Sequence, residues 1–155
     1  MVQPMRRRDR QLPKDQAIQL LQTCEHAVLA TVNEDFTPYC IPISPVLEGE
    51  HLYFHCAPEG QKLDNIRQNT CVCLTCVGFT ELLPAEFSTR YESAVAVGTA
   101  KMVEDAAEKV HALKLLCTKY APGNMAAFEK AAAASLHRTA ICKIKLESVT
   151  GKAKR

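Results

Sequence analysis

The sequence lacks the signatures of several common functional classes. It contains neither G-x-G-x-x-G nor G-x-x-x-x-G-K, so nothing supports a Rossmann or P-loop nucleotide site. No apolar run is long enough to span a membrane, and segment 1–15 lacks the apolar core of a secretory signal. The formal net charge of +2 is too small to indicate a nucleic acid or an anionic membrane. We therefore expect a cytoplasmic protein with neither partner.

Positive charge nevertheless gathers at both ends of the chain. Arginines fill most of segment 6–10, and Lys152, Lys154 and Arg155 close the sequence. Neither run contains aromatic residues that could stack on bases, so solvated arms are the favoured interpretation. A chain of 155 residues suits one domain. We expect a basic N-terminal arm over residues 1–13 and a single domain over residues 14–155.

The eight cysteines include one dense cluster, C-x-C-x-x-C, formed by Cys71, Cys73 and Cys76. A structural zinc site usually needs a second pair of ligands, and no other C-x-x-C is present. A redox C-x-x-C normally lies at a helix N-terminus, whereas this cluster falls in a run typical of a buried strand. Packing in the core is therefore favoured over metal or redox chemistry, and no metal site is expected.

The pattern of apolar residues predicts a mainly β protein with short flanking helices. Helical spacing covers residues 14–26, 62–69, 106–120 and a short segment from Asn124 to about residue 134. Strand-like segments cover residues 27–33, 37–47, 51–57, 71–79, 91–104 and 138–148, with a loop over 80–90. Asp105 and Asn124 are placed to cap helices, and Gly98 indicates a bend or a close backbone approach. Val110, Leu113 and Cys117 are expected on the buried stripe of helix 106–120. Six strands joined mostly by hairpins favour an antiparallel barrel over a parallel α/β sheet.

Segment 51–69 has the most informative local pattern. Apolar and polar residues alternate through the strand, and Pro58, Glu59 and Gly60 then break it. Helical spacing begins at Gln61, which brings Lys62 beside the free N–H groups of the first helical turn. Such an arrangement binds anions, phosphate above all. On these residues alone, an ordinary strand-turn-helix unit with a solvated lysine remains the alternative.

Four motifs, in the same order along the chain, resemble those of one known family. They are MRRRDR at 5–10, TPYCIPIS at 37–44, HLYFHCAPEGQKLDNIRQN at 51–69 and RTAICKIKLESVTGKAK at 138–154. Together they are similar to the FMN-binding split-barrel superfamily, which includes the pyridoxamine-phosphate oxidases, and most of all to its nitroimidazole-resistance (Nim) branch. The resemblance implies a six-stranded antiparallel split barrel that forms a homodimer, with FMN in a groove at the interface.

The same resemblance assigns residues to the cofactor. A strand backbone would face the isoalloxazine ring, a strand end would follow the ribityl chain, and a helix start would hold the phosphate. The implied cofactor residues are Cys40, Ile41, Pro42, Ile43, His55, Cys56, Gln61, Lys62 and Ser93. Cys56 replaces the usual Nim serine, and Gln61 occupies a position where the oxidases often carry arginine. Arg90 and Tyr91 are nearby polar candidates.

The implied activity is FMN-dependent electron transfer from a reductant to a small substrate, plausibly a nitroaromatic compound. His55 is the candidate catalytic residue, because an imidazole can donate a proton near neutral pH; its alternative is a structural strand histidine. The other histidines, His26, His51, His111 and His137, are expected to be structural. A pyridoxamine-phosphate-oxidase-like oxidase is a weaker alternative, since the chain lacks that group's longer, arginine-bearing C-terminal portion. The alternative from a different functional class is a non-catalytic protein that binds flavin or haem.

Overall fold

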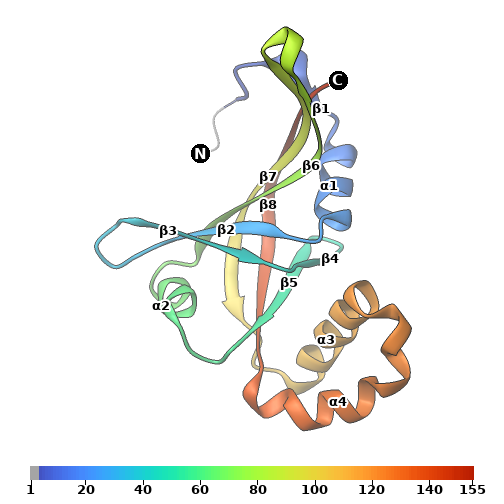
Figure 1. The fold of residues 1–155 in the computed structure, drawn as a ribbon. Coiled ribbons are helices and arrows are strands. Elements are labelled where there is room, and N and C mark those ends of the chain that lie inside the picture. The colour runs from blue at the N-terminus through green and yellow to red at the C-terminus, as the bar shows by residue number, and fades with distance from the viewer. Residues whose placement is uncertain (1–3) are drawn as a thin grey trace.

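The computed structural model describes residues 4–155, and antiparallel strands dominate it (Figure 1). The strands are β1 (Gln11–Leu12), β2 (Ala27–Val32), β3 (Pro38–Ile43), β4 (Val46–Glu48), β5 (His51–Cys56), β6 (Cys71–Leu83), β7 (Ser88–Met102) and β8 (Ala140–Lys154). The helices are α1 (Lys14–Thr23), α2 (Gln61–Gln68), α3 (Ala106–Tyr120) and α4 (Phe128–Ser135), with 3-10 turns at Arg8–Arg10, Pro84–Glu86, Pro122–Ala127 and Leu136–Arg138. Within residues 4–155, no helix combines the length and apolar character needed to cross a lipid bilayer.

A short link between two edge strands closes the sheet into a split barrel. The strand order is β3-β2-β6-β7-β8-β5-β4, with β1 added against β8. The two end strands are consecutive in the chain and are joined only by Ser44 and Pro45. A link this short reaches about 11 Å at most, so the sheet must curl until its ends meet. Pro45 is fully buried, and its carbonyl accepts hydrogen bonds from Lys119 Nζ at 2.8 Å and Tyr120 Oη at 2.7 Å.

The predicted mainly β, antiparallel split barrel with flanking helices is confirmed, although the sheet has eight strands instead of six. The predicted strand 37–47 is divided at Ser44 and Pro45 into β3 and β4. The second additional strand, β1, comes from the predicted arm, where Gln11 and Leu12 pair with Lys152 and Gly151 of β8.

Two predicted boundaries are wrong because pairing between strands extends them past the residues with a clear apolar pattern. The expected loop 80–90 is the outer part of the β6–β7 hairpin, where Leu82 pairs with Thr89 and an ion pair of 2.9 Å joins Arg90 to Glu81. The last strand continues past residue 148 to Lys154, because β7 pairs with it over its whole length. Local sequence carries little of this pairing energy.

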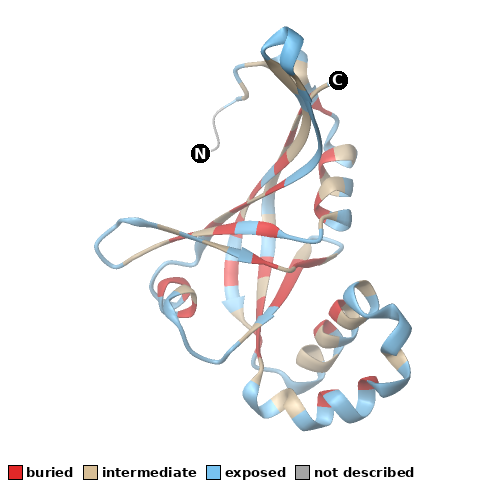
Figure 2. Cartoon of the chain, in the orientation of Figure 1, coloured by how far each residue is buried: buried red, intermediate tan, exposed pale blue. Residues whose placement is uncertain are grey.

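The buried side chains form two clusters on opposite sides of the sheet. Figure 2 shows buried positions on the strands and on the flanking helices. The first fills the barrel and includes Ala17 and Leu21 of α1, with Leu29, Leu52, Phe54 and Leu74 from the strands. The second lies beneath α3 and joins Tyr53 and Ile141 to Ala112 and Leu116. The expected buried stripe on α3 is confirmed in part: Leu113 packs against this cluster, whereas Val110 and Cys117 are half-buried and do not belong to it.

Two helix starts were predicted from capping residues, with different outcomes. Asp105 does cap α3, because its carboxylate accepts a hydrogen bond of 2.8 Å from the Glu108 amide. Asn124 does not cap α4. It lies inside the 3-10 turn Pro122–Ala127, and α4 begins later, at Phe128.

The cysteine cluster on β6 divides between the two faces of the sheet. Cys76 is buried in the barrel core, as predicted. Cys71 is exposed and Cys73 is half-buried, so the prediction of core packing is wrong for Cys71. All eight cysteines are free thiols in this structure.

Gly98 marks the close backbone approach expected from its position in the strand. The register between β7 and β8 shifts between Val97 and Gly98. A Cβ atom at Gly98 would lie 2.3 Å from the Lys145 carbonyl oxygen, which is far below van der Waals contact.

We expect Gly98→Ala to lower the free energy of unfolding by about 2–3 kcal/mol, because a backbone atom cannot move aside as a side chain can. Gly123→Ala is the matched control, since no atom lies within 4 Å of the added methyl group. Urea denaturation of the two variants beside the parent measures the difference. Equal stability of the two variants would contradict the assignment.

Candidate functional site

Helix α2 begins at a glycine that leaves the first turn open. Gly60, the N-cap residue, has a φ of 133°, in a region that only glycine adopts readily. It offers no side-chain cap, so the Gln61 and Lys62 amides stay available to an external acceptor, whereas the Leu63 amide donates to the Gly60 carbonyl oxygen at 2.9 Å. Leu63 and Ile66 are buried and anchor the helix against the sheet. The strand-turn-helix unit predicted for residues 51–69 is thus present.

An open hollow of about 460 Å³ lies where β3 and β5 end and α2 begins. Its lining residues are His26, Pro42, Ile43, Ser44, His55 and Lys62. Four of these are predicted site residues, brought together from three separate elements. Between them they supply one ammonium group, two imidazoles and one hydroxyl. No group of three metal-ligating side chains occurs among residues 4–155, so this donor set suits an anion better than a metal cation.

His26 is a candidate that sequence reasoning missed, because it was assigned a structural role. Its Nδ1 atom lies 3.3 Å from Ser44 Oγ, and this hydrogen bond holds the imidazole beside the hollow. The antiparallel register pairs Ala27 with Ile43, so the next positions outward are His26 and Ser44. Extending the hairpin register outward from the turn between β2 and β3 would have identified this pair from the sequence.

Five predicted cofactor residues lie outside the hollow: Cys40, Ile41, Cys56, Gln61 and Ser93. Ile41 and Cys56 pack against the barrel core, and Cys40 is exposed on β3. Burial raises the pKa of the Cys56 thiol, while the nearby Lys62 ammonium opposes this effect. Cys56 and Lys62 are therefore close in space, although the thiol faces inward.

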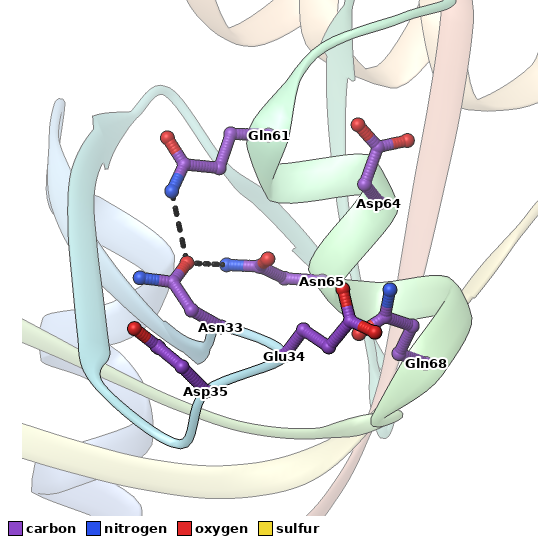
Figure 3. Close-up of a pocket in the computed structure, with 7 residues that line it drawn as sticks. All are labelled: Asn33, Glu34, Asp35, Gln61, Asp64, Asn65 and Gln68. Atoms are coloured by element: carbon purple, nitrogen blue, oxygen red, sulfur yellow. Dashed lines mark hydrogen bonds between the residues drawn. The ribbon is translucent and has the colours of Figure 1, made fainter.

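Gln61 faces a second, acidic hollow on the other side of α2 (Figure 3). Gln61 Nε2 and Asn65 Nδ2 both donate to Asn33 Oδ1, at 2.9 and 2.8 Å. This network ties α2 to the turn after β2. Glu34, Asp35 and Asp64 also line the hollow, so its charge disfavours an anion. Of these two hollows, only the one with Lys62 suits a phosphate.

Ser93 lies on an outward-facing surface of the sheet, which we call the open face. Antiparallel register places Pro42, Val28, Thr75 and Val95 side by side across β3, β2, β6 and β7. Ser93 is two residues from Val95 and pairs with Val77. Apolar side chains on this face are exposed: Val28 by 42%, Val77 by 62% and Val95 by 40%. Pro42 also lines the hollow, so the open face and the hollow adjoin.

The two additional polar candidates, Arg90 and Tyr91, make contacts at the protein surface. Arg90 makes the ion pair with Glu81 described above. The ammonium group of Lys152 lies 5.8 Å from the centre of the Tyr91 ring. Neither residue lines the hollow beside Lys62.

Comparison with solved structures shows that this fold recurs in flavin-related proteins. A candidate 5-nitroimidazole antibiotic resistance protein from Bacteroides thetaiotaomicron aligns at 23% identity with a TM-score of 0.77, over 92% of this chain and 86% of that one. The flavocytochrome Anf3 from Azotobacter vinelandii aligns at 18% identity with a TM-score of 0.84, over 98% and 72%. An FAD and heme binding protein from Mycobacterium smegmatis aligns at 20% identity with a TM-score of 0.82, over 94% and 74%.

Sequence comparison identifies the family. Among curated proteins, no sequence matches this chain closely enough to indicate a relative. The sequence model of the pyridoxamine 5'-phosphate oxidase family, in contrast, matches residues 13–153, nearly the whole chain. The resemblance inferred from four short motifs is thereby confirmed, and the chain belongs to the pyridoxamine 5'-phosphate oxidase family.

Proposed function

We propose that this protein is an FMN-dependent oxidoreductase that reduces small nitroaromatic compounds at the expense of a reductant. The observation that carries the proposal is the hollow at the start of α2, where Lys62, His55 and His26 converge. The fold, the family and the neighbouring flavin-related structures support the same class of activity. We also propose a cytoplasmic location, which suits a chain with eight free thiols.

The hollow fits the phosphate of a flavin mononucleotide by its charge. A phosphate monoester carries between one and a half and two negative charges near neutral pH. Lys62 supplies one positive charge, and the uncapped amides of α2 supply partial positive charge beside it. The imidazoles of His26 and His55 can add N–H donors. The backbone of β3 from Cys40 to Ile43 runs away from the hollow and offers a surface for an aromatic ring.

A bound flavin would supply the electron transfer, while the chain would position the reactants and donate protons. The imidazole of His55 lies at the end of β5, is exposed and lines the hollow. It can therefore reach a substrate and donate a proton to an oxygen or nitrogen atom that gains electrons. His26 is held through Ser44, which suits a binding role better than proton transfer.

We propose that the functional unit is a homodimer formed through the open face. This face presents exposed apolar side chains that water solvates poorly. Its neighbour, the hollow, then lies at the edge of the interface. Ser93 does not reach the hollow of its own chain, so a cofactor role for Ser93 requires a second copy. Dimerisation thus accounts for both the apolar surface and the position of this residue.

A non-catalytic haem binder is the second candidate, favoured by the two imidazoles in the hollow. Turnover of a reduced nicotinamide or a nitroaromatic by flavin-loaded protein supports the oxidoreductase. A haem absorption band on titration, with no turnover of either compound, supports the binder.

We expect Lys62→Ala to weaken FMN binding by roughly tenfold to a hundredfold, because one charge-assisted contact to phosphate is lost. Lys145→Ala is the matched control, since Lys145 is an exposed lysine on β8 outside the hollow. Lys143 is less suitable, because its ammonium contacts Glu108 at 2.6 Å. Quenching of flavin fluorescence measures the affinities for FMN and, in parallel, for FAD. Failure of the parent protein to bind either flavin would refute the proposal, and equal affinities of both variants would refute the phosphate assignment.

We expect His55→Gln to lower kcat for nitroaromatic reduction about a hundredfold while FMN affinity changes little, because a proton donor is removed. His111→Gln serves as the control, since His111 lies on α3 and pairs with Glu48. Steady-state kinetics with saturating flavin separate the two variants. Full activity of His55→Gln would exclude proton donation by His55.

We expect Val77→Asp to convert the dimer to a monomer, because a carboxylate would be buried in an apolar interface. Ala133→Asp on α4 is the control, since it adds the same charge at an exposed position away from the open face. Sedimentation velocity measures the oligomeric state. A monomeric parent protein, or an unchanged dimer in Val77→Asp, would rule out the proposed interface.

A further inference from the structure

The last two residues of α3 donate hydrogen bonds to two segments that border the hollow. Lys119 Nζ donates to the carbonyl oxygens of Cys24, at 2.7 Å, and Pro45, at 2.8 Å. Tyr120 Oη donates to the carbonyl oxygens of Glu25, at 3.0 Å, and Pro45, at 2.7 Å. The first segment joins α1 to β2, and the second joins β3 to β4. We call Lys119 and Tyr120 the α3 clamp, because together they hold both segments.

The α3 clamp acts on both sides of the pair formed by His26 and Ser44. The Glu25 carbonyl belongs to the peptide group that ends in the His26 nitrogen, and Pro45 directly follows Ser44. The Ser44 hydroxyl lies 3.3 Å from His26 Nδ1, and both residues line the hollow with Lys62. Each member of the pair is therefore next in sequence to a residue whose carbonyl the clamp holds.

The pair has little other support. The ladder between β2 and β3 ends where Ala27 pairs with Ile43, so His26 and Ser44 lie just beyond the last paired residues. His26 is exposed, and its contact with Ser44 is at the long end of the range for a hydrogen bond. Water competes with an exposed contact of this kind, so it contributes little rigidity by itself. The backbone held by the clamp is what fixes the place of the imidazole.

The α3 clamp is itself anchored to the barrel. Leu116, one turn before the clamp, is only 3% exposed and packs in the cluster beneath α3. Helix α3 lies with α4 on one side of the barrel, in the segment between β7 and β8 (Figure 1). A lysine in the last turn of a helix often bonds to the carbonyls of its own helix. Lys119 bonds instead to two carbonyls outside α3, so it links this helix to the border of the hollow.

We propose that Lys119 and Tyr120 are positioning residues of the cofactor site, an inference that rests on the proposed binding of FMN. Neither residue lines the hollow, so both act through the imidazole of His26. When the Ser44 hydroxyl donates to Nδ1, the ring carries its proton on Nε2. This N–H is a donor for a phosphate oxygen, beside the ammonium group of Lys62. The segment that carries α3 thus determines how tightly the phosphate is held, although it lies outside the site.

The first test is a double-mutant cycle on FMN affinity, measured by quenching of flavin fluorescence. We expect Lys119→Met to weaken binding about tenfold and Tyr120→Phe, the milder change, about threefold. Lys109→Met is the matched control, because Lys109 also donates from α3 to a carbonyl oxygen, that of Leu136, which lies outside the hollow. In a His26→Ala background, either clamp substitution should change the affinity by less than about twofold. Equal losses with and without His26, as general destabilisation would give, overturn the proposal.

The second test uses the protein without flavin, so it separates this inference from the proposed function. NMR relaxation of the imidazole ring carbons measures the mobility of each histidine side chain. The His26 ring should be ordered in the parent and become mobile in Tyr120→Phe, as it does in Ser44→Ala, while the His55 ring is unchanged. Equal mobility of the His26 ring in all three proteins would overturn the inference even if FMN binds. A parent protein that binds no flavin refutes the proposed function, and loosening of the His26 ring would still show that the α3 clamp positions it.

Discussion

The two-residue link between β3 and β4 is the constraint on which the rest of the structure depends. Ser44 and Pro45 join strands from opposite ends of the sheet, so the sheet has to close. The end of α3 stabilises this link, because Lys119 and Tyr120 both donate to the Pro45 carbonyl. Closure in turn brings the end of β3 beside the end of β5 and the start of α2. The hollow with Lys62 exists only because these three ends converge.

Charge on the two sides of α2 decides which hollow can receive a phosphate. One side carries Lys62 with two imidazoles, and the other carries three carboxylates beside the amide network on Asn33. Gln61 and Lys62 are adjacent in sequence, yet they line different hollows. The network that occupies Gln61 fixes the orientation of α2, and this orientation directs Lys62 toward the hollow.

Strand β6 has two different faces because alternate residues point to opposite sides of the sheet. Val77 and Cys73 belong to the open face, where a second copy would pack. Cys76 faces inward and is buried in the barrel core. Lys119 Nζ, at the end of α3, donates to the carbonyl oxygens of both Cys24 and Pro45, so one ammonium group ties the end of α1 to the closing link.

Local patterns were enough to predict much of this protein. The alternation in β5, the break at Gly60, the helical spacing of Leu63 and Ile66, and the Asp105 cap all depend on neighbours in sequence, and all appear in the structure. Pro42, Ile43, His55 and Lys62 were assigned to the site by resemblance to the family, and closure of the sheet brings them to one hollow.

Other features were decided by tertiary structure alone. The continuation of β8 along β7 to Lys154, and the meeting of the ends of β3 and β5 with the start of α2, join residues far apart in the chain. Hydrophobic periodicity determined which segments become strands and which side chains face inward. Register and closure determined which of those side chains meet, because the energy of such contacts arises only after the barrel forms.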